Sequence, residues 1–194
     1  MSRRWTLRLV ACALGASAVL AGCSSGNQEA RETLPSPSSA APSEEELPPL
    51  GPEDMPMPAE ARTQDAAGAE AFVRYYIELI NRTSTVMDAQ PLRDLSDGCR
   101  DCDRIADNVE RDAAAGLARV GGLLTVTGFG QPEIDGSGSQ MAIVVDQSPL
   151  QVLDPSGAPV PGRGSSAFTG LSGGAACSWN VEQSNWVMTN LTFG

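Results

Sequence analysis

Residues 65–82 read DAAGAEAFVRYYIELINR, and this stretch decides the fold class. Its apolar residues recur at i, i+3, i+4, i+7, i+8 and i+11, a spacing that places them on one face of an α-helix. Their positions are Ala69, Phe72, Val73, Tyr76, Ile77 and Ile80. We therefore expect an amphipathic helix over residues 65–82, with Thr63 as its N-cap.

Further elements are expected on the C-terminal side of this helix. Residues 90–95 predict a short helical turn, and residues 99–115 predict a longer helix that Gly116 is placed to end. Beyond this helix the apolar period changes to two, which is typical of β-strands. The expected strands cover residues 123–129, 140–146, 150–153, 175–181 and 186–193. Helices first and strands afterwards predict an α+β domain, with the helices packed on one face of an antiparallel sheet.

Residues 1–22 have the composition of a signal peptide. Arginines at positions 3, 4 and 8 precede an apolar run over residues 9–20, which is shorter than the roughly 20 residues that span a bilayer. Leu20-Ala21-Gly22-Cys23 then resembles a bacterial lipobox. The resemblance implies an acyl chain such as palmitate on Cys23 and a lipid anchor on the extracytoplasmic face of the cell membrane. An ordinary secretory signal with a chance cysteine is the alternative, and both the general secretory and the twin-arginine export routes remain open.

Residues 24–60 differ in composition from the rest of the chain. They hold eight of the fourteen prolines and the acidic triplet at positions 44–46, and they contain no aromatic residue. Such a segment cannot bury enough apolar surface to fold, so we expect a disordered linker. The predicted organisation is a signal peptide at 1–22, a lipidated cysteine and linker at 23–60, and an α+β domain at 61–194.

The basic residues exclude several classes of protein. All 13 are arginine, so the chain has neither lysine nor histidine, and its net charge is −11. It therefore cannot form a histidine-based catalytic site, a Schiff base or a P-loop. Its net acidity argues against a nucleic-acid partner. Arg119 and Arg163 are candidates for contact with an anion.

Three cysteines lie in the expected domain, at positions 99, 102 and 177. In an oxidising compartment, Cys99 and Cys102 are expected to form a structural disulfide at the start of a helix. A bridge from one of them to Cys177, or a redox-active pair favoured by the helix N-terminus, are the alternatives. Three thiols without imidazole form a poor zinc site, so we expect no metal and no cofactor.

Three aromatic residues are candidates for a ligand cavity. Tyr76 lies on the apolar face of the predicted helix, and Trp179 and Trp186 flank the last predicted hairpin. Packing in the hydrophobic core is the alternative for all three.

Two resemblances place the chain more closely. Pro56-Met57-Pro58, the run GAEAFVRYY at 68–76, and Leu95-Ser96 before Cys99-Arg100-Asp101-Cys102 resemble an actinobacterial lipoprotein family that is defined only as a domain of unknown function. The order of helices and strands is similar to the NTF2-like cone fold, which implies N-terminal helices on a curved antiparallel sheet. Neither resemblance implies an activity.

We therefore expect a noncatalytic, lipid-anchored domain that binds a protein or a small molecule in the cell envelope. One alternative is an NTF2-like enzyme that uses a tyrosine, Tyr75 or Tyr76, and a carboxylate as an acid–base pair. The other is a thiol–disulfide protein that uses Cys99 and Cys102.

Overall fold

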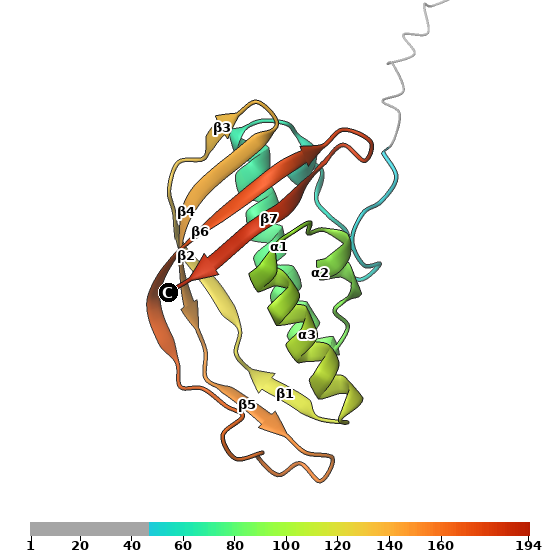
Figure 1. Cartoon of the computed structure of the whole chain (residues 1–194), viewed down its shortest axis with the longest axis vertical. Coiled ribbons are helices and arrows are strands. Elements are labelled where there is room, and N and C mark those ends of the chain that lie inside the picture. The colour runs from blue at the N-terminus through green and yellow to red at the C-terminus, as the bar shows by residue number, and fades with distance from the viewer. Residues whose placement is uncertain (1–46) are drawn as a thin grey trace, which may run out of the picture. The chain divides into compact units, whose positions relative to one another are not determined.

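The computed structural model describes residues 47–194, and Figure 1 shows their arrangement. Four helical elements come first: η1 (Ala59–Arg62), α1 (Ala66–Val86), α2 (Gln90–Asp94) and α3 (Arg100–Ala114). Seven strands follow: β1 (Ala118–Gly121), β2 (Leu124–Phe129), β3 (Glu133–Asp135), β4 (Gly138–Gln147), β5 (Leu150–Leu153), β6 (Phe168–Asn180) and β7 (Asn185–Phe193). None of these helices is long and apolar enough to cross a membrane.

The strands form two antiparallel sheets. Five strands form the main sheet, in which the order is β2-β4-β6-β7 and β3 also pairs with β4, while β1 and β5 form a separate two-stranded sheet. The register shifts between Val145 and Gln147 of β4 and between Ala176 and Cys177 of β6. Such bulges increase local twist and bend a strand, and Figure 1 shows the main sheet curving along the helices. The expected α+β class, with N-terminal helices packed on a curved antiparallel sheet, is confirmed.

Helix α1 supplies the centre of the hydrophobic core. Its apolar face is buried against the sheet, and Phe72, Tyr76 and Ile77 have no exposed surface. The N-cap is Asp65 and not Thr63, because Asp65 Oδ1 accepts a hydrogen bond of 2.7 Å from the backbone N–H of Gly68. The helix also continues four residues beyond the predicted end at 82.

The second long helix begins and ends close to the predicted positions. Cys99 is the N-cap of α3, and its Sγ accepts a hydrogen bond of 3.3 Å from the backbone N–H of Cys102. Gly116, with φ of 68°, follows the last turn in the left-handed conformation that favours glycine.

The five predicted strands are present, but two were missed and one is longer than expected. β1 and β3 are short and were not predicted. β6 begins at Phe168, seven residues before the predicted start. The first half of the strand was not predicted because it contains Gly170, Gly173 and Gly174, and glycine has low strand propensity. Only glycine fits at position 173, because a Cβ there would collide with the backbone of Thr192 on β7.

The segment before η1 packs on the domain. Met57 is buried, and its backbone N–H donates to the carbonyl of Leu50 at 2.7 Å. The hydroxyl of Tyr75 donates to the carbonyl of Met55 at 2.9 Å, and the guanidinium of Arg82 forms a two-pronged pair with Asp54. The packed part of the chain therefore begins before 61, which corrects the linker boundary expected from composition. The predicted signal peptide, Cys23 and the linker up to residue 46 lie outside the described residues.

Candidate functional site

A cavity of about 340 Å³ lies between the helices and the strands. Side chains of α1 and α3 form one wall, and side chains of β1, β2, β4, β5, β6 and β7 form the other. Its volume is at the lower end of the range for small-molecule sites, which is roughly 300–1,000 Å³. The cavity is therefore large enough for one small ligand.

About half of the cavity wall is apolar. The apolar lining residues are Ile80, Ile105, Leu124, Leu150, Phe168, Leu171 and Phe193. Ile105, Leu150, Leu171 and Phe193 are only half-buried, and Phe168 is 45% exposed. The protein's own atoms thus leave apolar surface uncovered here, and such surface favours an apolar ligand.

The charged residues in the wall are both arginines, Arg104 on α3 and Arg119 on β1. No acidic side chain of residues 47–194 lines the cavity. The same residues contain nine arginines and nineteen acidic side chains. The cavity wall therefore carries charge of the opposite sign to the domain around it.

Arg119 is positioned by Asp112, which is completely buried near the end of α3. Nε of Arg119 donates to Oδ2 of Asp112 at 3.0 Å, and Arg163, in the loop between β5 and β6, pairs with Oδ1 of the same carboxylate. Nη1 of Arg119 lies 3.5 Å from the hydroxyl of Ser84 on α1. Because two guanidiniums share one carboxylate, this cluster of three ionic groups has a net charge of +1.

The three aromatic residues predicted to line a cavity do not line this one. Tyr76 and Trp186 are completely buried, with the hydroxyl of Tyr76 donating to the carbonyl of Leu92 at 3.3 Å and Nε1 of Trp186 donating to the carbonyl of Thr63 at 2.9 Å. Trp179 packs edge-on against Trp186, with 5.3 Å between the ring centroids. The structure gives them the alternative role, which is packing in and around the core.

The hydroxyl groups of both tyrosines of α1 donate hydrogen bonds to backbone carbonyls. The hydroxyl of Tyr75 donates to the carbonyl of Met55, as that of Tyr76 does to Leu92. Burial raises the pKa of Tyr75 to about 12 and raises the pKa of Tyr76 well above its ordinary value. General acid–base catalysis favours a pKa near the working pH, so these shifts go in the unfavourable direction for an acid–base role.

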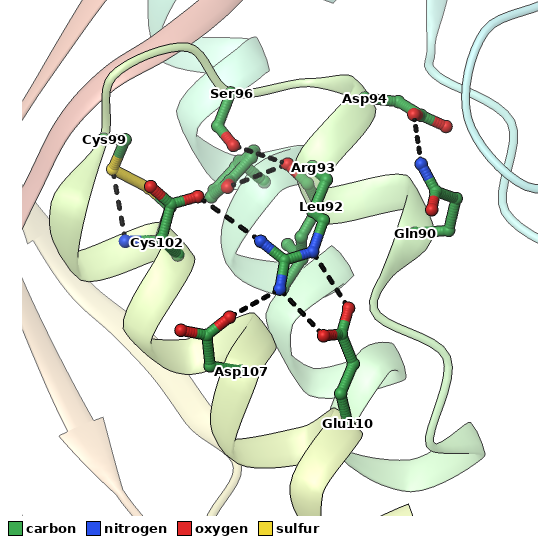
Figure 2. A network of polar contacts seen from close by, with 11 residues as sticks. Gln90, Leu92, Arg93, Asp94, Ser96, Cys99, Cys102, Asp107 and Glu110 are labelled. Atoms are coloured by element: carbon green, nitrogen blue, oxygen red, sulfur yellow. Dashed lines mark hydrogen bonds and ion pairs between the residues drawn. A yellow bond between two sulfur atoms is a disulfide. The ribbon is translucent and has the colours of Figure 1, made fainter.

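Cys99 and Cys102 form the predicted disulfide, which is drawn in Figure 2. Both residues are buried, at 1% and 2% exposure. Thiol–disulfide exchange needs an attacking thiolate to reach a sulfur atom. The burial of both sulfurs therefore supports a structural role, in which the disulfide fixes the first turn of α3.

Cys177 is buried and is not bridged to any other cysteine of residues 47–194. Sγ of Cys177 lies 4.0 Å from Sδ of Met188. Burial raises the pKa of the Cys177 thiol to about 12. A protonated thiol in an apolar environment is a poor nucleophile.

Arg93 ties α2 to the exposed side of α3, next to the disulfide (Figure 2). Its guanidinium lies 2.6 Å from Asp107, 2.9 Å from Glu110 and 3.6 Å from Asp103. The contacts with Glu110 and Asp107 raise the pKa of Arg93. These acidic side chains are therefore occupied by a cation of the chain itself. In the part of the chain that the structure describes, no group of cysteine, aspartate and glutamate side chains is arranged to hold a metal ion.

A second hollow, of about 520 Å³, lies over β4, β6 and β7. Its floor is formed largely by small residues, among them Gly173, Gly174 and Ala175, and its one charged lining side chain in the described range is Glu133. It has few large apolar side chains. The cavity between helices and strands is thus the better candidate for a ligand.

Among the candidate site residues named from the sequence, Arg119 is the one that lines this cavity. Arg119 and Arg163 were named as candidates for an anion, and the structure brings both to Asp112, with Arg119 in the cavity wall. The apolar lining was missed because its members come from elements that are far apart in the sequence. Phe168 and Leu171 could have been found only if the strand predicted at 175–181 had been extended towards the N-terminus.

Comparisons with known proteins show no family for this chain. No family model matches the chain, and no curated protein sequence matches it. The crystal structure of the intermembrane space region of the chloroplast protein ARC6 matches with a TM-score of 0.49 and 18% identity, over 68% of this chain and 97% of that one. A designed NTF2 chain matches with a TM-score of 0.39 and 12% identity, over 65% of this chain and 99% of that one. The function of this chain must therefore be inferred from its own residues.

Proposed function

We propose that this protein is a noncatalytic binding domain that takes up one small, partly apolar molecule in the cavity between its helices and its strands. The observation that carries this proposal is the cavity itself, with half-buried leucine, isoleucine and phenylalanine side chains in its wall. Apolar surface left open in a concave site is a general mark of ligand binding.

The polar groups around the cavity support binding more than catalysis. Ser84, Asn108 and Gln147 line it along with the two arginines. Neither Tyr75 nor Tyr76 lines the cavity. These groups can orient a ligand, but they do not form a nucleophile with an adjacent base.

The N-terminal sequence gives the proposed location. Residues 1–23 combine a signal peptide with a lipobox, so we place the domain on the extracytoplasmic face of the membrane, held there by lipid on Cys23. The proline-rich linker would let the cavity meet ligands close to the lipid surface.

Binding of a neutral apolar dye such as Nile red tests the cavity. We expect the fluorescence of the dye to rise with purified domain, and the substitution Ser84→Trp to abolish the rise by filling the cavity from α1. Thr85→Trp is the matched control, because Thr85 is the next residue of the same helix but is exposed and does not line the cavity. Asn108→Trp fills the cavity independently from α3.

The proposal fails if the dye does not bind, or if Ser84→Trp and Asn108→Trp bind it as well as the Thr85→Trp control does. Circular dichroism of each variant establishes that the change in binding does not come from unfolding.

A further inference from the structure

The charge of the cavity wall points to a more specific ligand. We propose that the ligand is a single-chain amphiphile with a carboxylate head group, whose head binds Arg119 and Arg104 and whose hydrocarbon chain lies against the apolar wall. This inference rests on the proposed function and names the chemical class of its ligand.

The charged side chains beside the cavity do not fully neutralise one another. Asp112 neutralises one of the two guanidiniums that it binds, which leaves one positive charge on the pair of Arg119 and Arg163. Arg104 is already paired with Asp101, whose Oδ1 lies 3.1 Å from its Nε. The ion pairs leave one uncompensated positive charge on the cluster of Arg119, Asp112 and Arg163 beside the cavity, which matches one carboxylate.

The guanidinium of Arg119 is only partly used by hydrogen bonds within the chain. Its Nε is used by Asp112, and its Nη1 lies at the long distance of 3.5 Å from Ser84. Its Nη2 has no hydrogen-bond partner among residues 47–194, although the side chain is only 14% exposed. A guanidinium has five N–H donors in a fixed fork, so Arg119 retains donors for a further anionic acceptor in the cavity.

Arg104 lies at an exposed position of the cavity wall. Its side chain is 64% exposed, and it lines the cavity one residue before the half-buried Ile105. A charged group in this position can draw an anion towards the opening, and the attraction weakens as salt increases.

The volume of the cavity limits the size of the ligand. A volume of about 340 Å³ suits a molecule with one chain better than a membrane lipid with two. The apolar wall then covers the hydrocarbon part, with Leu124, Leu171 and Phe193 contributed by three different strands.

Calorimetric titration with three twelve-carbon probes, each below its micelle concentration, tests the assignment. We expect dodecanoate to bind at least about tenfold more tightly than dodecanol, because charge-assisted hydrogen bonds to an arginine add to the apolar contact. Dodecyl phosphate, which carries up to two charges, should bind more weakly than dodecanoate. Equal binding of dodecanol, or tighter binding of dodecyl phosphate, overturns the carboxylate head group while leaving the proposed function intact. Failure of all three probes and of the neutral dye overturns the proposed function itself.

Arginine variants test which residues recognise the head group. Arg119→Gln should reduce the preference for dodecanoate over dodecanol to about threefold or less, and its binding of dodecanol reports whether the cavity is still folded. Arg104→Gln, on the exposed side of α3, should lower the preference at least about threefold. Arg100→Gln is the matched control, because it removes the same charge from the same helix at an exposed residue that does not line the cavity. The inference fails if Arg104→Gln and every folded Arg119→Gln sample keep the preference of the Arg100→Gln control.

Discussion

The carboxylate of Asp112 has no exposed surface, and it accepts a hydrogen bond of 3.0 Å from Nε of Arg119. Asp112 comes from the last turn of a helix, and Arg119 comes from the first strand after it. Arg163 binds the other oxygen of the same carboxylate from a loop 51 residues further along the chain. One buried side chain thus joins helix, strand and loop beside the cavity.

The substitution Asp112→Asn should therefore be strongly destabilising. It removes the negative charge from between two guanidiniums, one of which is only 14% exposed. Breaking a buried ion pair by removing one partner lowers the free energy of unfolding by about 2–4 kcal/mol. Urea denaturation of the purified domain measures the change. Asp135→Asn, at the exposed end of β3, is the control and should change stability by less than about 0.5 kcal/mol. Equal effects of the two substitutions would contradict the role assigned to Asp112.

The disulfide should contribute modestly to stability, and its first cysteine should also act as a helix cap. The Cys99–Cys102 bridge closes a very short loop, so its loss should cost about 2 kcal/mol in chain entropy. Because Sγ of Cys99 accepts from the backbone N–H of Cys102, a serine hydroxyl could take over that bond. We expect Cys99→Ser/Cys102→Ala to be more stable than Cys99→Ala/Cys102→Ala by about 1 kcal/mol. Thermal unfolding compares the two variants, and identical melting temperatures would show that the cap has no effect.

Stability should fall in alkaline solution through Cys177. Its pKa is raised from 9.0 to about 12, so the folded protein holds a proton that the unfolded chain releases. This contribution is fully present below about pH 9 and is lost as the pH rises towards 12, at roughly 1 kcal/mol per pH unit. The chain has no lysine, so no lysine titrates in this window, and Tyr75 adds its own loss only above about pH 10.

Urea denaturation at several pH values between about 8 and 10 measures this slope. Cys177→Ala should be nearly insensitive to pH over that interval, apart from a uniform loss from the smaller side chain. Parallel pH profiles for the two proteins would show that Cys177 is not the group responsible.

Cys23→Ser should release the protein from membranes. The resemblance of residues 20–23 to a lipobox predicts acylation of this cysteine, and two or more acyl chains would hold the protein stably because each buried CH₂ contributes about 0.8 kcal/mol. Fractionation of cells followed by detection of the protein in pellet and supernatant measures the effect. Cys12→Ser is the matched control, since Cys12 lies in the apolar run of the predicted signal peptide, and the Cys12→Ser protein should remain in the pellet. A Cys23→Ser protein that still pelleted with the membranes would contradict the lipid anchor.

The sequence predicted the helices well because their patterns are local. The apolar positions of α1 repeat within 18 residues, and Gly116 ends α3 through its own backbone conformation. The N-cap was misassigned to Thr63 because both Thr63 and Asp65 are good capping residues, and only the hydrogen bond to Gly68 distinguishes them.

The sequence was less informative where strands depend on their neighbours. The first half of β6 is rich in glycine, yet it pairs with β4 along its length, with Leu171 opposite Val145 and Phe168 opposite Gln147. Strand propensity reflects packing against neighbouring strands, so a strand of this composition cannot be recognised alone. The packed segment at 50–57 was missed for a similar reason: its apolar residues are few, and their burial depends on contacts with α1.

By itself, then, the sequence determined the α+β class, the presence of α1, α2 and α3, and the absence of histidine and lysine chemistry. These follow from patterns within a few residues or from composition alone. Tertiary structure alone decided that Tyr76 and Trp186 pack in the core, that Asp112 holds Arg119 and Arg163, and that an apolar cavity with a positive wall lies between α1, α3 and the strands. The reason is physical: a cavity is formed by side chains from many elements, and its charge depends on which carboxylates the fold brings to which arginines.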